Sequence, residues 1–545
     1  MVGGELVVEV LRGQGVRRVF CVPGESYLPV LAALDGSGID VVVCRHEGAA
    51  AMAAEAVGKL TGRPGVALVT RGPGAANAAS GVHVAQQDST PLVLLVGQVA
   101  RGMRHRDAFQ EVDYGAFFGG MAKHVEEVTE AARLPEALSR AFHLAMSGRP
   151  GPVVVALPED VLSGEVADPG ALPGPARVAE PAPDDEDMAA FMEMLAVAER
   201  PLIIAGGSRW DGQARKRLME LAEFLHVPVA ASFRRQMLFD ALHPAYAGDV
   251  GLGINPALKE RVIDSDLLIL LGGRFSEVPS QGFSLLGAPE PGKALVHVHP
   301  GAEEPGRVYR PALAICSTPG NFLAALRQRR VTGADRRAEW MRAAHDDYLQ
   351  WSEKPPQTPG DVQMGEIISW LRENLPKDAI ITNGAGNYAI WVHRFWRFRE
   401  WGTQLAPVSG SMGYGLPAAL AAKLECPERT VVCFAGDGCF QMTMADFATA
   451  VQQEANIIVI VVDNGQYGTI RMHQQRRFPN RNCSTQLTNP DFAAYAEACG
   501  GAAFQVKKTK DFFPAFKAAQ KNTQPTLIHL QTSPKALTPD MTIPD

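Results

Sequence analysis

The stretch AGDGCFQMTMADFATAVQQEANIIVIVVDNGQYG, residues 435–468, contains the strongest pattern in the chain. The apolar, β-branched run Thr430–Ala435 leads into this stretch, and a second such run, Ile457–Val462, lies within it. Both runs are typical of buried strands. Between them, Thr443–Gln453 carries apolar residues at helical spacing. The pattern therefore predicts one βαβ unit, with two parallel strands joined by a right-handed crossover. We expect Gly436-Asp437-Gly438 to form a turn that needs glycine for its backbone conformation.

Two polar residues follow the strands of this unit. Asp437 comes after the first strand and Asn464 after the second. Because the carboxyl ends of parallel strands meet at one edge of a sheet, where open α/β sheets bind ligands, we expect the two side chains to lie close together. One carboxylate and one amide oxygen beside glycine-rich backbone suit Mg²⁺ that also binds phosphate oxygens. The residues themselves thus predict a magnesium–diphosphate site.

Composition limits the class of protein. The chain has 545 residues, 46% of them hydrophobic and 20% charged, so we expect a folded protein of about three domains. The net charge of −7 without a basic block argues against nucleic-acid binding. No apolar run reaches the ~18 residues of a membrane span. The eight cysteines form no CxxC pair, and we expect free thiols in a cytoplasmic protein.

Strand and helix signals alternate through most of the chain, which predicts an α/β fold of three parallel-sheet domains. Expected strands of the first domain are Arg18–Val22, Ile39–Cys44, Val66–Thr70, Leu92–Val96 and Val153–Leu157. We expect domains at residues 1–165, 189–330 and 362–545, with linkers at residues 166–188 and 331–361. Two Gly-Gly pairs follow strands of the second domain, but neither forms GxGxxG, so they do not predict a dinucleotide site.

The opening stretch resembles the signature of thiamine-diphosphate enzymes, in which GDG is followed after about 25 residues by Asn. Here residues 439–463, 25 in number, separate Gly438 from Asn464. The resemblance implies that Asp437, Asn464 and the backbone carbonyl of Gln466 bind Mg²⁺, which in turn binds the diphosphate of thiamine diphosphate. Gly436, Gly438 and Cys439 would lie against the cofactor. The sequence departs from the family at Asp463, often Asn, and at Cys439, often Ser or Ala.

Glu47 begins an alanine-rich segment after a predicted buried strand. On its own it could be a helix N-terminal glutamate favoured by the helix dipole. The resemblance implies a catalytic role, in which a family glutamate hydrogen-bonds N1′ of the aminopyrimidine and promotes loss of the thiazolium C2 proton. Apolar walls around this carboxyl group would raise its pKa and help it to share a proton.

Further motifs imply contacts with the cofactor. The TxGPGxxN-like turn contains Gly74 and Asn77, and Pro23 follows the first expected strand. In the segment GSMGYGLPAA, residues 410–419, the family uses an apolar side chain, here Met412, to hold the cofactor bent. A carbonyl two residues earlier, here that of Gly410, accepts from the 4′-amino group.

One more loop resembles the family's diphosphate-binding segment. It contains Gly386 and Asn387, in a loop where the family usually has a Gln-His pair. For the whole family, the active site lies between the first domain of one subunit and the third domain of another. The resemblance therefore implies a homo-oligomer, at least a dimer, with a tetramer as the expected state.

Within the family, DAFQEVD at residues 107–113 is similar to the acetolactate synthase catalytic subunit. This likeness implies that Phe109 and Gln110 face the reacting carbons and that Lys123 lies near the substrate channel. The resulting hypothesis is a carboligase that decarboxylates a 2-oxoacid such as pyruvate and transfers the two-carbon unit to a second carbonyl. Small 2-oxoacids or aldehydes are the expected substrates.

Two departures keep alternatives open. The subfamily has Trp where this chain reads Thr469-Ile470-Arg471-Met472-His473, which also fits a 2-hydroxyketone or 2-hydroxyacyl lyase or a simple decarboxylase. Gly273-Arg274-Phe275 resembles a segment whose Arg contacts FAD and the acceptor. The strand before the FAD loop, however, reads VHVHP at residues 296–300, so FAD binding stays open. A silent paralogue that binds thiamine diphosphate without turnover is the non-enzymatic alternative.

Overall fold

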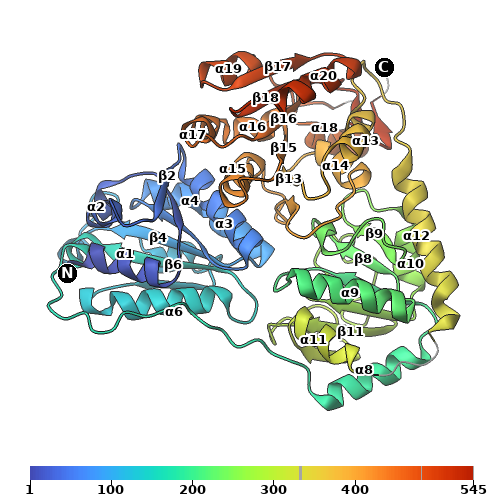
Figure 1. The fold of residues 1–545 in the computed structure, drawn as a ribbon, viewed down its shortest axis with the longest axis horizontal. Coiled ribbons are helices and arrows are strands. Elements are labelled where there is room, and N and C mark those ends of the chain that lie inside the picture. Colours follow the sequence, from blue (N-terminus) through green and yellow to red (C-terminus); the bar gives the residue numbers. More distant parts are fainter. Residues whose placement is uncertain (330–333, 480, 544–545) are drawn as a thin grey trace.

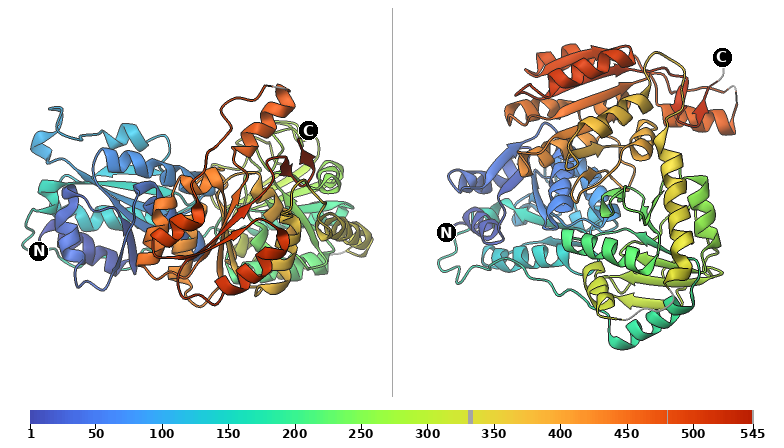
Figure 2. Two further views of the ribbon diagram at one scale, coloured as in Figure 1. Left: turned by 90° about the horizontal axis from the view of Figure 1, so that it is seen from above. Right: turned by 45° about the vertical axis from the view of Figure 1, so that its right-hand side comes forward.

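The structure is a computed structural model and describes residues 1–329, 334–479 and 481–543. Three parallel six-stranded sheets, each with helices packed on it, follow one another along the chain. Figure 1 shows them as a blue first unit, a green-to-yellow central unit and an orange-to-red third unit. The third unit lies against both others, and the N- and C-termini lie at opposite ends of the molecule (Figure 2). The predicted α/β class of three parallel sheets is confirmed.

The first sheet has the order β2-β1-β3-β4-β6-β5, and every neighbouring pair is parallel. Its strands are β1 (Arg18–Cys21), β2 (Asp40–Val43), β3 (Gly65–Val69), β4 (Leu92–Gln98), β5 (His124–Glu127) and β6 (Pro152–Pro158). Its helices are α1 (Gly3–Gly13), α2 (Leu28–Leu34), α3 (Glu47–Thr61), α4 (Pro73–Asp88), α5 (Tyr114–Phe118), α6 (Leu134–Met146) and α7 (Glu159–Leu162). Strands β3, β4 and β6 in the middle of the sheet are almost wholly apolar and buried because both faces of the sheet are covered, whereas the edge strand β5 is mostly polar and half-buried.

The central sheet has the order β12-β11-β10-β7-β8-β9. Its strands are β7 (Pro201–Ala205), β8 (Val229–Ser232), β9 (Tyr246–Val250), β10 (Leu267–Leu271), β11 (Ala294–His299) and β12 (Leu313–Cys316). Helices α8 (Asp185–Val197), α9 (Gly212–Leu225), α10 (Pro256–Asp264) and α11 (Pro319–Arg327) accompany them. Counted along this sheet, the order is that of doubly wound nucleotide-binding folds, with the switch point between β7 and β10.

The third sheet has the order β14-β13-β15-β16-β18-β17, which repeats the order of the first sheet strand for strand. Its strands are β13 (Ile380–Asn383), β14 (Gln404–Leu405), β15 (Val431–Gly436), β16 (Ile458–Asp463), β17 (Ala502–Val506) and β18 (Thr526–Gln531). Its helices are α13 (Met364–Asn374), α14 (Tyr388–Phe395), α15 (Gly415–Glu425), α16 (Asp437–Gln441), α17 (Phe447–Gln452), α18 (Gly468–Arg477), α19 (Phe492–Ala498) and α20 (Thr509–Ala519). A short hairpin, β19 (Ala536–Thr538) and β20 (Met541–Thr542), follows them.

The crossover between β15 and β16 differs from the expected single helix over Thr443–Gln453. A first helix, α16, begins directly at Asp437, and α17 follows after a break at Thr443. Thr443 leaves the helical conformation, and its Oγ1 donates to the carbonyl of Gly413 at 2.8 Å. The break therefore ties the crossover to the neighbouring loop.

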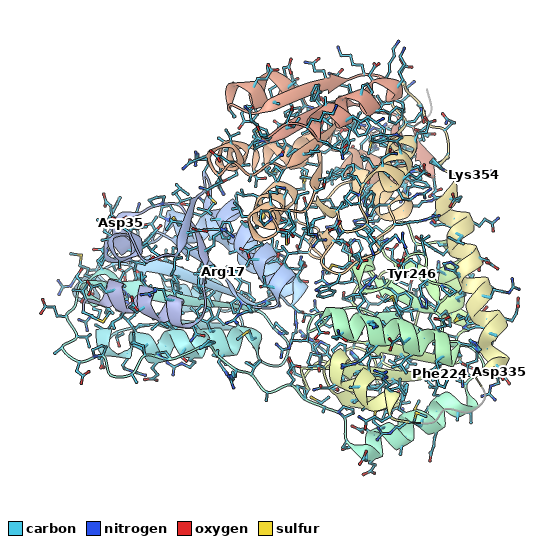
Figure 3. All side chains as sticks on the ribbon, in the orientation of Figure 1. Arg17, Asp35, Phe224, Tyr246, Asp335 and Lys354 are labelled. Carbon is cyan, nitrogen blue, oxygen red and sulfur yellow. The ribbon has the colours of Figure 1, made fainter. Side chains whose placement is uncertain are left out.

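The segments expected as linkers differ from each other. Residues 167–184 contain no helix or strand. Of the segment 331–361, residues 331–333 lie outside the described residues, and the rest contains α12 (Ala338–Glu353). This helix runs along the outer side of the molecule, with Asp335 and Lys354 flanking its ends (Figures 1 and 3), and its Met341 and Tyr348 belong to the central core. The domain boundaries themselves stay predictions. Among the described residues, no helix has the length and apolar character that crossing a bilayer requires.

The first and third units share one hydrophobic core. Ala50, Ala53 and Ala54 of α3 and Ala418 and Ala422 of α15 all belong to it and are fully buried. Small side chains allow two helices to approach closely, and burial of apolar surface then stabilises the contact. The alanine-rich run after Glu47 is thus a helix–helix interface within the chain.

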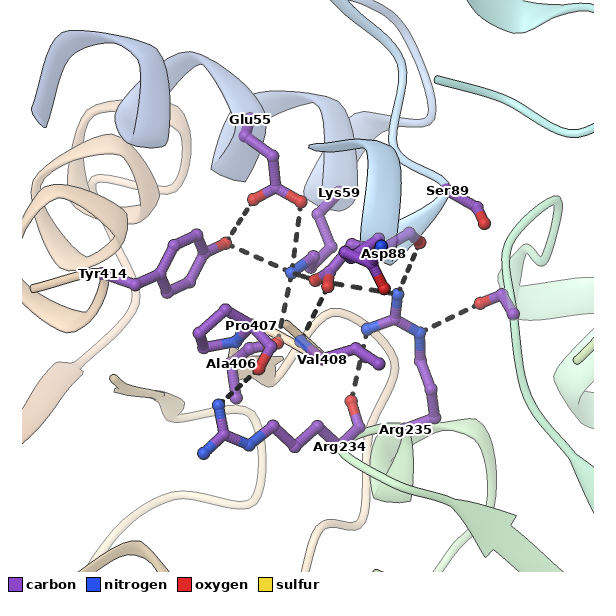
Figure 4. Close-up of polar contacts among 12 residues, drawn as sticks. Glu55, Lys59, Asp88, Ser89, Arg234, Arg235, Ala406, Pro407, Val408 and Tyr414 are labelled. Carbon is purple, nitrogen blue, oxygen red and sulfur yellow. Dashed lines mark hydrogen bonds and ion pairs between the residues drawn. The ribbon is translucent and has the colours of Figure 1, made fainter. Parts of the chain in front are cut away.

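A buried charge network joins all three units at Asp88, the last residue of α4 (Figure 4). Its carboxylate is paired with Lys59 of α3 and accepts from the backbone N–H of Val408 at 2.6 Å. Arg235 of the central unit donates to the Asp88 carbonyl at 3.0 Å. Lys59 also lies 3.2 Å from Glu55, which accepts from the Tyr414 hydroxyl at 2.5 Å.

We expect Asp88→Ala to destabilise the protein strongly. The substitution leaves the buried Lys59 ammonium with Glu55 as its remaining carboxylate partner and Val408 without its acceptor, and breaking such a buried pair costs about 3–5 kcal/mol. Urea unfolding of the purified protein would measure the loss. Glu339→Ala, which removes an exposed pair with Arg342, is the matched control and should change stability by less than about 1 kcal/mol. Equal losses in both variants would contradict this role for Asp88.

Candidate active site

A cavity of about 370 Å³ lies at the carboxyl edge of the third sheet. Turns that follow β13, β14, β15, β16 and β18 line it, as expected for a ligand site in an open α/β sheet. Residues after β8 and β9 of the central unit close its other end. The lining is largely apolar, and the predicted residues that it contains are Gly386, Asn387, Gly410, Met412, Gly436, Asp437, Gly438, Cys439, Asn464 and Gln466.

Asp437 and Asn464 line the same cavity, as the βαβ pattern predicted. Asp437 is 3% exposed, and burial raises the pKa of its carboxyl group to about 6. A carboxylate whose charge is poorly solvated gains from a cation beside it. Asn464 Oδ1 accepts from the backbone N–H of Gln466 at 3.2 Å, and Gln466 is itself buried. These oxygen donors fit Mg²⁺.

Asn489 is a residue of this region that the sequence analysis missed. Its Nδ2 donates to Asp437 Oδ2 at 2.8 Å and to Asp463 Oδ1 at 2.7 Å. Asp463 in turn lies 2.8 Å from His529. Asn489 thus holds two neighbouring carboxyl groups in place, and its position 52 residues after Asp437 carries no spacing signal.

The glycines of the GDG motif are required for space and not for backbone conformation, which corrects the expected special turn. Gly436 has a φ of −70° at the end of β15, and Gly438 lies within α16. A Cβ atom on Gly438 would lie 2.6 Å from the Tyr467 ring, and one on Gly436 would lie 3.1 Å from the Tyr388 ring. By contrast, Gly410 has a φ of +69°, which favours glycine.

Cys439 is 2% exposed and joins three turns around the cavity. Its Sγ accepts from the Tyr388 hydroxyl and from the Gly413 N–H, each at 3.3 Å. Asn387 Oδ1 accepts from Thr469 Oγ1 at 2.9 Å. Met412 faces the cavity and packs on the third core. These contacts fix the shape of the cavity wall.

A second group of predicted residues lies at the carboxyl edge of the first sheet. Glu47, the first residue of α3, is 9% exposed, and its Oε2 accepts from Asn77 Nδ2 at 2.9 Å. A Cβ on Gly74 would lie 3.3 Å from Glu47 Oε1, so glycine leaves room beside this carboxyl group. Pro23 follows β1 at the same edge and is exposed. Glu47 does not line the cavity at the third sheet of its own chain.

The likeness to acetolactate synthase implies roles for Phe109, Gln110 and Lys123, but these residues do not all lie at the same edge of the first sheet. The backbone of Gln110, with a φ of +64°, packs on Gly72 at the carboxyl edge, and Phe109 beside it is 75% exposed. Lys123 instead precedes β5 at the amino edge of the sheet. Its ammonium donates to the carbonyls of Ser147 and Arg149, and burial lowers its pKa to about 8. The structure separates Lys123 from Glu47 and Gln110.

Three family models match the chain. The N-terminal binding domain, the central domain and the C-terminal binding domain of thiamine pyrophosphate enzymes match residues 1–117, 188–326 and 384–530. The chain belongs to the thiamine pyrophosphate enzyme family, and the prediction of a thiamine-diphosphate-dependent enzyme is confirmed.

Comparison with individual relatives shows which members of the family the chain resembles. The chain is 30% identical to a probable acetolactate synthase large subunit of Methanocaldococcus jannaschii, over 99% of this chain and 93% of the relative. It is 32% identical to the acetolactate synthase large subunit of Corynebacterium glutamicum, over 97% and 86%. It is 31% identical to the acetolactate synthase isozyme 2 large subunit of Escherichia coli, over 97% and 95%. The predicted likeness to acetolactate synthase is confirmed along nearly the whole chain.

We expect Asp437→Ala to abolish Mg²⁺-dependent retention of thiamine diphosphate. Asn489→Ala should weaken Mg²⁺ binding about 10- to 100-fold, because it removes the partner that orients a ligand. Calorimetric titration of the cofactor at fixed Mg²⁺ would measure both effects. Asn374→Ala, at an exposed helix end, is the control. Unchanged retention in Asp437→Ala would exclude this residue as a metal ligand.

Proposed function

We propose that the protein is a thiamine-diphosphate- and Mg²⁺-dependent carboligase of acetolactate synthase type. It would decarboxylate a pyruvate-like 2-oxoacid and transfer the two-carbon unit to a second carbonyl compound. The observation that carries the proposal is the gathering of Asp437, Asn464, Gly410 and Met412 on one cavity, in a chain similar to acetolactate synthase large subunits over nearly its full length.

The residues at the third sheet fit the cofactor's metal-bound end. Asp437, Asn464 and the Gln466 carbonyl would hold Mg²⁺, which would in turn bind the diphosphate. Thiamine diphosphate, when bound, supplies a nucleophilic carbon and an electron sink for decarboxylation of a 2-oxoacid. Met412 and Gly410 would orient its two rings, and the largely apolar wall would limit the access of water to the reacting atoms.

Glu47 would hydrogen-bond N1′ of the aminopyrimidine and share a proton with it. Its carboxyl group is buried at the start of an alanine-rich helix, and Asn77 fixes its orientation by a 2.9 Å hydrogen bond. Because Glu47 does not line the cavity of its own chain, the complete site would combine Glu47 of one chain with the cavity of another. A homo-oligomer of at least two chains follows from this proposal.

The central unit offers little room for FAD at its switch point. At the switch point between β7 and β10, a Cβ on Gly207 would lie 1.7 Å from the Gly272 carbonyl oxygen, so the two turns pack together. Arg274 donates to the Gln87 carbonyl at 2.6 Å, and His297 lies 2.9 Å from the Gly273 carbonyl. We expect purified protein to show no flavin absorbance near 450 nm, and a flavin released on denaturation would contradict this.

A lyase or simple decarboxylase of the same family is the second candidate. The observation that favours it is helix α18, which follows the metal end and presents exposed Ile470 and His473 where the subfamily has Trp. A changed acceptor-binding face would alter which carbonyl compound reacts second.

Product analysis would separate these candidates. With Mg²⁺, thiamine diphosphate and pyruvate, we expect CO₂ release and formation of acetolactate. Acetaldehyde as the main product would favour the decarboxylase, and cleavage of a 2-hydroxyketone without CO₂ release from pyruvate would favour the lyase. Absence of turnover in all three assays would contradict the carboligase proposal.

We expect Glu47→Gln to retain the cofactor but to slow exchange of its C2 hydrogen by at least about 100-fold, the usual lower range for a lost acid–base group. Hydrogen–deuterium exchange of bound thiamine diphosphate, followed by NMR after acid quench, measures this rate. Glu136→Gln, an exposed helix residue, is the control. An unchanged exchange rate in Glu47→Gln would exclude the proposed role.

A further inference from the structure

The β4–α5 loop, residues 104–112, has an unusual backbone. His105, Asp107 and Gln110 have positive φ angles of +62°, +56° and +64°. Residues with a side chain adopt this conformation rarely, and each instance costs free energy. Three of them in one short loop therefore require other contacts that hold the chain in this shape.

A single carboxylate supplies most of these contacts. Glu111 Oε1 accepts from the backbone N–H of His105 at 2.8 Å, and Oε2 accepts from that of Ala108 at 3.3 Å. Arg104 also donates to Oε1, at 2.8 Å. These hydrogen bonds, that of His105 above all, hold the pKa of Glu111 below its usual value, so the group is charged at neutral pH. Glu111 thus closes the loop on itself.

Two further side chains join the loop to the sheet. Arg104 lies 3.2 Å from Glu127, the last residue of β5. Gln98, the last residue of β4, is buried and donates to the Val112 carbonyl at 2.9 Å. The loop therefore has a defined position relative to the carboxyl edge of the first sheet.

The loop also contacts the turn that lies beside Glu47. A Cβ on Gly72 would lie 2.7 Å from the Gln110 carbonyl oxygen, so only glycine lets the two backbones approach this closely. The Gly72 N–H donates to the Tyr114 hydroxyl at 3.0 Å. Two residues later, Gly74 leaves room for the Glu47 carboxyl group. The loop and Glu47 thus belong to one continuous surface.

Phe109 projects from this surface. Its large apolar side chain is 75% exposed, and among the described residues that line the cavity none comes from this loop. Under the proposed function, Glu47 enters the cavity of a second chain. Because the loop touches the turn beside Glu47, Phe109 and Gln110 would approach that cavity together with it. Burial there would remove the apolar ring from water.

Two reactions compete for the two-carbon unit that remains after pyruvate loses CO₂. In one, the reacting carbon takes a proton and the unit leaves as acetaldehyde. In the other, this carbon bonds to the carbonyl carbon of a second pyruvate, whose oxygen takes the proton, and acetolactate leaves. An apolar ring over the reacting carbon limits the access of water and so slows the first reaction. The position of the ring thus affects the product ratio.

We propose that Glu111 is a positioning residue for carbon–carbon bond formation. Its carboxylate fixes the β4–α5 loop so that Phe109 covers the reacting carbon in the cavity of a second chain. The inference rests on the proposed carboligase function. Glu111 acts through the loop backbone and not by contact with the substrate, so the loss of CO₂, which depends on Glu47 and the metal-bound cofactor, does not require it.

The test measures CO₂, acetaldehyde and acetolactate for holoenzyme with saturating pyruvate. For Glu111→Ala we expect the ratio of acetaldehyde to acetolactate to rise about tenfold, the effect of one lost charged hydrogen bond. CO₂ release in the first turnover, measured by rapid quench, should stay near the wild-type rate. Glu111→Gln, which keeps one acceptor oxygen, should shift the ratio by less, and it replaces Glu111→Ala if that variant does not fold.

Phe109→Ala provides the second arm of the test. It should shift the ratio in the same direction as Glu111→Ala, because both variants remove the ring from the reacting carbon. The double variant should shift the ratio no further than the larger single shift, since two changes that act through one contact are not additive. Fully additive shifts would mean that Glu111 does not act through Phe109 and would overturn the proposal.

Glu126→Ala is the matched control. Glu126 lies on β5, is half-buried like Glu111 and accepts from Arg140 at 2.6 Å, but it lies outside the loop. Its removal should leave the product ratio unchanged. An equal shift in Glu126→Ala, or loss of CO₂ and both products in Glu111→Ala at an unchanged ratio, would show that Glu111 only supports the fold and would overturn the proposal.

Hydrogen–deuterium exchange separates this inference from the proposed function. In Glu111→Ala the amides of His105 and Ala108 should exchange at least about tenfold faster than in wild type, because their acceptor is lost. In Glu126→Ala their exchange should not change. If wild type makes acetolactate, yet loop exchange and product ratio are unchanged in Glu111→Ala, the inference fails alone. If wild type releases no CO₂ from pyruvate, the proposed function fails, whatever the exchange rates of the loop.

Discussion

The buried carboxylate of Asp88 is the contact on which the arrangement of the three units depends. Lys59 of the first unit and Val408 of the third unit bind its carboxylate oxygens, and Arg235 of the central unit binds its backbone carbonyl. Asp88 therefore contacts residues of all three units. A buried carboxylate tolerates few geometries, because each lost partner leaves an unsolvated charge. The loop from Val408 to Met412 therefore has a defined position, and with it one wall of the cavity.

The two ends of the cavity carry different polar groups. Oxygen donors lie at the third-sheet end, with Asp437 and Asn464, while the central-unit end has a single cation in an apolar wall. The two ends therefore differ in electrostatic character, since carboxylate and amide oxygens attract cations and the Arg234 guanidinium attracts anions. The same apolar wall strengthens each of these interactions by lowering the local dielectric constant.

Local sequence was enough to predict the parallel sheets and the meeting of Asp437 with Asn464, because strand periodicity and chain direction decide both. It was not enough where tertiary neighbours decide the outcome. The GDG glycines make room for Tyr467 and Tyr388, which come from other turns. Asn489 reaches Asp437 from a loop without a motif, and Lys123 lies at the amino edge, a position that depends on the β5–β6 register.

The matching strand order of the first and third sheets has a consequence for assembly. Two sheets of the same strand order occur in one chain, and their carboxyl edges differ, one carrying Glu47 and the other Asp437. If each active site combines unlike copies from two chains, then two chains close two sites by a twofold exchange. In an assembly built from such twofold pairs, each pair completes two sites, whereas a chain without a partner leaves its cavity without a glutamate.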